Sequence, residues 1–199
     1  MSVTSSPSET ETTTHPLQEF ADGVAEAVGG SAAITFDTVK VSVAPDNWVP
    51  AHKAARDDLD LVFFSWLSAV DWANEVEVGD ALSDEVEENF EVLTTIADMS
   101  EGRRVTFSTN IAKDSASIAS LVDVYPGANW HEREAAEMFG IEFVGHPDPG
   151  HLYLPDSFIG NPLRKDYPLL SREVKPWPGD VDVEAMPGTD EPSTENPEA

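Results

Sequence analysis

The chain contains no cysteine among its 199 residues. This absence excludes disulfide bonds, thiolate nucleophiles, iron–sulfur ligation by cysteine and every cysteine-based zinc site. A redox centre held by cysteines would therefore have to belong to another chain. The absence leaves the compartment open, because a reducing cytosol tolerates cysteine without requiring it.

Basic residues are also scarce. The sequence has 11 lysines and arginines against 38 acidic residues, which gives a formal net charge of -27. Such a surface repels phosphate backbones and anionic lipid headgroups, so we expect no nucleic-acid partner and no direct membrane binding. A strongly acidic surface also fits a protein from a high-salt cell or one with a basic partner, and composition leaves both explanations open.

No long apolar run is present. No window approaches the roughly 20 apolar residues that span a bilayer, and residues 1–14 lack the basic start and apolar core of a signal peptide. We therefore expect the chain to stay on the cytoplasmic side. The polar residues 1–15 and the acidic residues 180–199 have too few apolar groups for a packed structure, and both are predicted to be disordered tails.

Hydrophobic periodicity predicts an α+β domain over residues 16–145, with a two-layer arrangement of helices on a mixed or antiparallel sheet. The region 61–67 is apolar on both faces, which is typical of a central strand covered on both sides or of a strand at the heart of a layered core. The acidic stretch 74–89 is predicted to be an exposed loop. The other expected elements are a helix at 17–28, a strand at 38–43, a short helix at 45–58, a hairpin of strands at 90–96 and 105–111, a helix from 114 or 115 to 125, and a helix from 129 that ends at Gly140.

The last of these helices carries several charged residues. Glu132 stands three residues after Asn129, in the position of a capping box. Arg133 and Glu137 are four residues apart and are predicted to pair, whereas Glu132 and Glu134 face different sides and do not form a paired-carboxylate site. The buried face of the helix is predicted to be Ala135, Met138 and Phe139.

Residues 146–179 are predicted to form an extended arm, because seven prolines there prevent regular helix or sheet pairing. The same segment is rich in leucine and aromatic residues, so we expect it to pack on another protein. It also lies in the region that has five of the eleven bases. Arg164, Lys165 and Asp166 are candidates for bonds across an interface, with local pairing to Asp156, Asp166 and Glu173 as the alternative.

Metal chemistry is the main rival interpretation. The acidic loop lacks the ligand spacing and central glycine of an EF-hand. His131-Glu132 resembles the start of a zincin helix, but the second histidine of that motif is replaced by Ala135. His146, Asp148 and His151 are separated by prolines that favour a turn. A free-standing acidic metal-binding or adaptor protein remains an alternative from a different functional class.

Two motifs carry a family resemblance. Residues 130–148 have the sequence WHEREAAEMFGIEFVGHPD and residues 161–169 have the sequence NPLRKDYPL. Both resemble, in the same order, the motifs of the C subunit of respiratory complex I, which is the 30 kDa-type subunit, and residues 171–179 look like its actinobacterial branch. The sequence departs from the family pattern at Pro149-Gly150-His151, at Ser157-Phe158 and at Asn161, where histidine is common.

The resemblance implies a cofactor-free subunit of the proton-translocating NADH:quinone oxidoreductase. Such a subunit packs beside the hydrogenase-like D subunit, which forms the quinone pocket with the B subunit. FMN and iron–sulfur clusters would lie in partner subunits, and the chain would be peripheral to the cell membrane through the complex. The equivalent subunit of a membrane-bound hydrogenase or of a dehydrogenase with another donor is an alternative.

No catalytic, cofactor-binding or metal residue is predicted. The residues of the two motifs are instead candidates for an interface with the partner subunits. These candidate interface residues are Glu132, Arg133, Glu134, Glu137, Phe139, Gly140, Gly145, His146, Pro147, Pro162, Leu163, Arg164, Lys165, Asp166, Tyr167 and Pro168.

Overall fold

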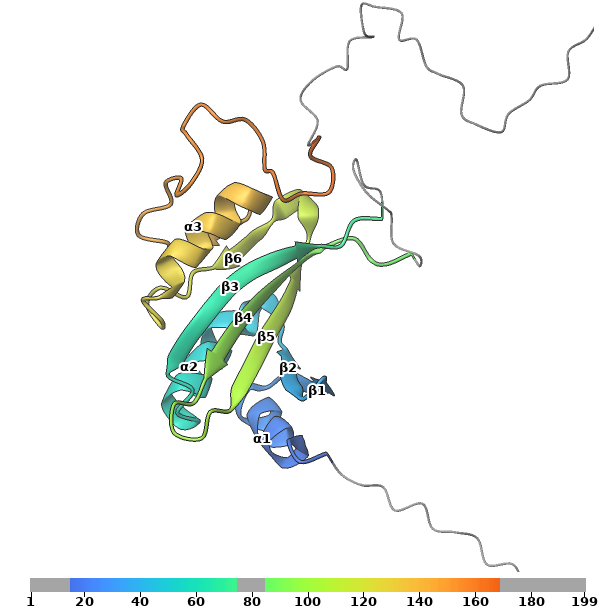
Figure 1. The fold of residues 1–199 in the computed structure, drawn as a ribbon, viewed down its shortest axis with the longest axis vertical. Coiled ribbons are helices and arrows are strands. Elements are labelled where there is room, and N and C mark those ends of the chain that lie inside the picture. The colour runs from blue at the N-terminus through green and yellow to red at the C-terminus, as the bar shows by residue number, and fades with distance from the viewer. Residues whose placement is uncertain (1–14, 75–84, 169–199) are drawn as a thin grey trace, which may run out of the picture. The chain divides into compact units, whose positions relative to one another are not determined.

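The computed structural model describes residues 15–74 and 85–168. Within these ranges it contains three α-helices, a five-stranded mixed sheet and a small two-stranded sheet (Figure 1). The predicted α+β class is therefore confirmed. The predicted tail up to residue 14, the acidic stretch 75–84, the arm residues 169–179 with two of the five bases, and the tail 180–199 lie outside the described residues.

The first helix, α1 (Gln18–Val28), confirms the predicted one. Its buried side chains are Ala21, Val24 and Val28, and it ends at Gly29, whose left-handed φ of 66° suits glycine. Strand β1 (Ser31–Thr35) was not predicted. It pairs antiparallel with β2 (Thr38–Ser42) through a two-residue turn. This turn lacks the Asn-Gly or Asp-Gly sequence that normally indicates a hairpin, which is why the sequence did not reveal it.

The main sheet has the strand order β1-β2-β5-β4-β3. Strands β4 (Phe90–Ala97) and β5 (Arg104–Ile111) form the predicted hairpin, and β5 also pairs in parallel with β2. Helix α2 (Trp48–Asp58), which follows a short 3-10 turn (Pro45–Asn47), packs on the sheet through His52. The ring of His52 lies 4.7 Å from that of Phe107, centroid to centroid.

His52 is fully buried and neutral. Its Nδ1 lies 2.7 Å from the Trp48 carbonyl oxygen and its Nε2 lies 2.8 Å from the Thr94 hydroxyl. Removal from water lowers the pKa of His52 to about 4, although the bond to the Trp48 carbonyl acts in the opposite direction. The core therefore contains a base that resists protonation.

The strand predicted as central is an edge strand. Strand β3 (Phe63–Asp71) pairs with β4 alone, and Phe63 at its start is 49% exposed. Its second apolar face is partly covered by helix α3 (Ala128–Phe139), since the Phe64 ring packs on His131. An apolar run thus indicates coverage of both faces, but it does not determine how many neighbouring strands are present.

The helix predicted from residue 114 or 115 to residue 125 is wrong. The structure has a short 3-10 turn (Lys113–Ser115), strand β6 (Ser117–Ala119) and a turn, and β6 pairs in parallel with β7 (Glu142–Val144). Ile118, Leu121 and Tyr125 are nevertheless buried. Strand β6 contains Ile118, and the turn that follows it contains Leu121 and Tyr125. In this turn the Leu121 carbonyl accepts the N–H groups of Val124 and Tyr125. Three buried residues can therefore have helical spacing without forming a helix.

Candidate functional site

The candidate site consists of helix α3 and the segment that follows β7. From here on the arm means residues 146–168, the described part of the predicted segment 146–179. The arm contains no helix or strand along these 23 residues of the described chain. It returns along α3 (Figure 1), and the contacts between the two determine which side chains remain free.

Glu137 is the central anchor of the arm. Its carboxylate accepts the backbone N–H groups of Leu152, Tyr153 and Leu154 at 2.9, 2.9 and 3.3 Å. Burial would raise the pKa of this carboxyl, but the three N–H donors outweigh it and lower the pKa. Glu137 therefore remains ionised and supplies the acceptors that an irregular backbone lacks.

Arg133, one turn earlier, binds the preceding part of the arm. Its guanidinium donates to the carbonyl oxygens of Gly150 and His151 at 2.8 and 2.7 Å and lies 3.5 Å from the Asp148 carboxylate. The predicted pair between Arg133 and Glu137 is wrong. Both side chains instead bind backbone groups of the arm, which offers charge-assisted bonds that a surface ion pair cannot match.

Glu132 faces the opposite side of the helix and is fully buried. Its carboxylate accepts the Ser120 hydroxyl and the Leu121 N–H, both at 2.6 Å. Burial raises its pKa despite these two bonds. The predicted capping box is therefore wrong: α3 begins at Ala128, and Glu132 fixes the end of β6 instead. Glu134 accepts the Tyr153 hydroxyl at 3.2 Å on the exposed side.

The end of α3 fits closely against the second half of the arm. Gly140 has a left-handed φ of 74°, and a β-carbon there would lie 2.8 Å from Asn161 Oδ1. Asn161 Nδ2 donates to the Glu137 carbonyl oxygen at 2.8 Å, and the Leu163 N–H donates to the Met138 carbonyl oxygen at 3.0 Å. Asn161, a departure from the family pattern, thus caps the helix and supports the arm. Of the predicted buried face, Ala135 and Phe139 are buried, whereas Met138 is half-buried.

The motif at 162–168 is joined to the end of β3. Asp71, which is buried, accepts the Lys165 N–H at 2.9 Å and the Lys113 ammonium at 2.7 Å. The Lys165 ammonium donates to the Ala73 carbonyl oxygen at 3.1 Å. Asp71 was not among the predicted site residues, although an acid at the end of an apolar strand is a detectable signal for a buried partner.

Arg164 and the residues around it make local contacts. Its Nε lies 3.3 Å from the Asp166 carboxylate, and its guanidinium carbon is 5.4 Å from the centroid of the Phe90 ring. Tyr167 stacks on Phe158 with 6.2 Å between ring centroids. Pro147 and Pro168 are exposed and Pro162 is half-buried. Arg164 thus pairs locally with Asp166, which was the predicted alternative to bonds across an interface. Bonds of this motif to another chain stay a prediction.

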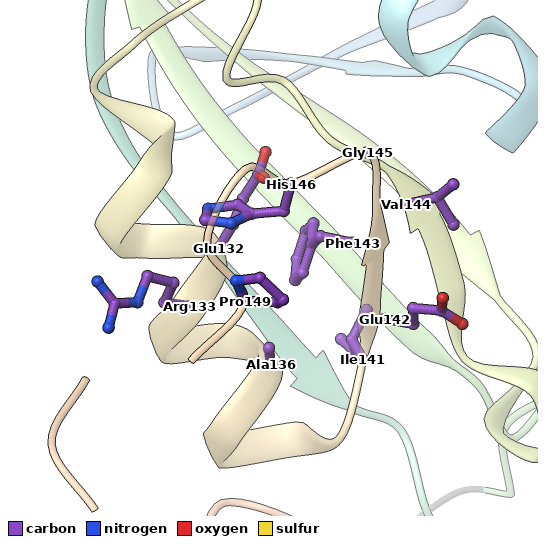
Figure 2. Close-up of a pocket in the computed structure, with 10 residues that line it drawn as sticks. All are labelled: Glu132, Arg133, Ala136, Ile141, Glu142, Phe143, Val144, Gly145, His146 and Pro149. Carbon is purple, nitrogen blue, oxygen red and sulfur yellow. The ribbon is translucent and has the colours of Figure 1, made fainter. Parts of the chain in front are cut away.

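A cavity of about 380 Å³ lies between α3, β7 and the start of the arm. Figure 2 shows Ala136, Ile141, Phe143 and Pro149 around it, with the Arg133 guanidinium directed away. Gly145 has a φ of 86° and turns the chain there. His146 Nε2 lies 3.0 Å from the Asn129 carbonyl oxygen, and the Asp148 N–H donates to its Nδ1.

Four large side chains of this site are exposed to solvent. Ile159 is 88% exposed, Tyr153 is 64% exposed and Leu163 is 52% exposed, and Trp130 on α3 is 68% exposed. The polar anchors of the arm are directed inward, which is the reverse of the usual arrangement at a free surface. Exposed apolar groups that are rimmed by polar residues mark interaction surfaces.

No group of three or more metal-binding side chains is gathered within residues 15–74 and 85–168. Among the helices of these same residues, none has the length and apolar character needed to cross a bilayer.

Comparison with known proteins gives consistent matches. Residues 41–173 match the protein family described as the 30 kDa subunit of respiratory-chain NADH dehydrogenase. The C subunit of the NADH-quinone oxidoreductase of Rhodobacter capsulatus is 37% identical over 157 residues, which cover 76% of this chain and 73% of that protein. The same-named protein of Roseiflexus castenholzii is 34% identical, with 75% and 80% covered.

Two solved structures share the fold. A trypsin-resistant fragment of Nqo5 superposes with a TM-score of 0.52 at 19% identity, covering 66% of this chain and 98% of the fragment. A chain of the membrane-bound sulfane sulfur reductase, an archaeal respiratory membrane complex, has a TM-score of 0.55 at 19% identity, with 72% and 79% covered. At this identity the two likenesses support the fold alone.

Proposed function

Because this chain belongs to the family of the 30 kDa subunit of respiratory-chain NADH dehydrogenase, we propose that it is a non-catalytic assembly subunit of that complex. It packs beside the hydrogenase-like D subunit, near the B subunit, and supports the module that reduces quinone. FMN and iron–sulfur clusters of the electron path lie in partner subunits, and the chain is peripheral to the membrane on the cytoplasmic side of this proton-translocating complex.

The observation that supports this role most is that other parts of the chain hold the backbone of the arm, while several large apolar side chains of the arm remain exposed. Glu137, Arg133 and Asp71 bind its backbone, so the arm has a defined conformation before any partner arrives. Preorganisation lowers the entropy that association would otherwise remove. Three of the exposed side chains of the arm, those of Ile159, Tyr153 and Leu163, are large and apolar, and they suit a protein surface rather than water.

The absence of cysteine agrees with the placement of clusters elsewhere, since this chain has no thiolate to ligate iron. Its contribution is then structural. It would position the subunits that hold the redox centres and contribute contact area, while the chemistry takes place in those subunits.

The test is to tag the chain in its own host and to measure which subunits co-purify. Wild-type chain should recover both the D and the B subunits. Ile159→Asp should lower the recovery of the D subunit at least about fivefold, because an anchor residue at an interface contributes more than about 1 kcal/mol. Met99→Asp is the matched control, because Met99 is 67% exposed in the turn between β4 and β5, remote in sequence from the arm.

Both variants should keep the thermal midpoint of the isolated chain, since neither side chain is buried. Recovery of wild-type chain alone, as a stable monomer without either of the two partners, would contradict the proposed function. Full recovery of the D subunit by Ile159→Asp would contradict the role of the arm.

A further inference from the structure

We infer that the turn between β1 and β2 is a second docking point, in which Phe36 inserts into an apolar pocket on another subunit of the complex. This inference rests on the proposed function as an assembly subunit. It concerns the opposite edge of the sheet from the arm, because β1 and β3 are the two edges and α3 packs along β3.

The turn has an unfavourable residue at its tip. The register pairs Thr35 with Thr38, so Phe36 and Asp37 alone form the loop, with φ values of 50° and 57°. Two left-handed residues define a type I′ turn, which strongly favours asparagine, aspartate and glycine. Phenylalanine at such a position is strained, because its β-carbon approaches the following carbonyl.

The side chain of Phe36 is also almost fully in water. It is 97% exposed, more than any other large apolar residue of the described chain. Backbone strain and exposure both make phenylalanine unfavourable at position 36 in the isolated chain. With 97% of the residue exposed, no contact within the described residues compensates for this cost. Burial in a partner would compensate, because an aromatic ring removes a large apolar area from water.

The turn is held in place for such a contact. The His15 Nε2 lies 2.9 Å from Asp37 Oδ1, and the β1–β2 ladder fixes both ends of the loop. Asp37, the residue after Phe36, has a side chain that is 88% exposed. The whole chain is also strongly acidic, with a net charge of -27. The complementary partner is therefore a pocket with apolar walls and a lysine or arginine at its rim.

The test uses the substitution Phe36→Asn, which should stabilise the isolated chain and weaken its incorporation into the complex. Phe36→Asn places a residue suited to the left-handed region at the tip and removes the ring. In the isolated full-length chain it should raise the thermal midpoint by about 2–4 °C, the shift expected from relief of one strained residue at this chain length. In the complex it should weaken incorporation.

Incorporation is measured by competition. Wild-type and Phe36→Asn chains with different tags are expressed together in the host, and their ratio in the purified complex is compared with the ratio in the free pool. We expect about a thirtyfold preference for wild type, as for the loss of a central aromatic anchor. Asp37→Asn should lower incorporation by only about threefold, because it removes an exposed charge alone. Met99→Asn, the control, should compete equally.

Equal incorporation of Phe36→Asn would overturn the inference, and so would a lowered thermal midpoint, because the ring would then pack within its own chain. A wild-type dimer that the variant loses would also overturn it, since the pocket would then belong to a second copy. These outcomes differ from failure of the proposed function, in which wild-type chain itself does not enter the complex.

Discussion

Replacement of Glu137 by alanine should release the arm from α3 without unfolding the sheet. The carboxylate is the acceptor for three consecutive backbone N–H groups, those of Leu152, Tyr153 and Leu154. In Glu137→Ala these donors lose their partner. The strands of the main sheet do not depend on it, because their hydrogen bonds are made within the ladder.

The magnitude follows from the number of bonds. A hydrogen bond to a charged group contributes roughly 1.5–3 kcal/mol, but Tyr153 is exposed and water can replace part of each bond. We therefore take about 1 kcal/mol for each donor, or about 3 kcal/mol together. This corresponds to roughly a 150-fold increase in opening of the arm.

Hydrogen exchange of the full-length chain measures this opening directly. Amides 152–154 should lose about two orders of magnitude of protection, while amides of β4 keep theirs. Glu134→Ala is the matched control, because Glu134 accepts only the Tyr153 hydroxyl on the exposed side. Unchanged exchange at 152–154, or an equal loss in β4, would refute the assignment of Glu137 as a local anchor.

Acid should reproduce the effect of the substitution. The folded pKa of Glu137 lies below the ordinary value of 4.5, so its stabilisation is complete above that value. It is lost as the pH falls through the lowered folded pKa. Protection of amides 152–154 should therefore decline below about pH 4.5 in the wild-type chain and should be independent of pH there in Glu137→Ala.

Three further substitutions and one change of pH test the packing at the end of α3, on α1, at the end of β3 and in the core. Gly140→Ala should lower the free energy of unfolding by about 2 kcal/mol, because alanine would have to adopt a left-handed φ with its β-carbon 2.8 Å from the Asn161 amide oxygen. Gly23→Ala is the matched control on α1, where a β-carbon meets nothing within 4 Å, and it should raise the free energy of unfolding by about 0.5–1 kcal/mol. Urea unfolding measures both changes. Asp71→Ala should destabilise by about 3 kcal/mol, because it leaves the Lys113 ammonium without its buried partner, and a loss under about 1 kcal/mol in the same assay would contradict the anchor. The pKa of His52 is lowered from 6.5 to about 4 in the folded chain, so burial of the neutral ring contributes fully to stability above pH 6.5. The free energy of unfolding should fall by about 3 kcal/mol as the pH drops from 6.5 to 4. A free energy of unfolding that stays constant over this window would exclude a neutral buried ring.

The fold was predictable where one local pattern determined one element. Helix α1, strand β2, helix α2 and the β4–β5 hairpin follow from periodicity with glycine or proline at their ends. Strand β1 was missed because its turn has Phe36-Asp37 in place of the usual glycine-containing pair. The segment after β5 was mistaken for a helix because Ile118, Leu121 and Tyr125 have helical spacing, although pairing of β6 with the distant β7 determines their positions.

The site was predictable as a set of residues but not as a set of contacts. The motif residues Arg133 and Glu137 do gather at the arm, yet each binds backbone rather than the other. Sequence spacing reports neighbours along a helix, whereas an irregular segment that returns over the helix offers stronger partners. The position of Asp71 at the end of an apolar strand indicates a buried partner, but the sequence does not identify that partner, because Lys165 is 94 residues away.

The most direct test of the central claim is a photo-crosslink from position 159. A photoreactive phenylalanine analogue in place of Ile159, incorporated in the host, reports which chain covers the outward face of the arm. We predict an adduct with the hydrogenase-like D subunit that is absent when the same analogue replaces Met99. An analogue at 159 that reacts with no other chain in the assembled complex would contradict the account.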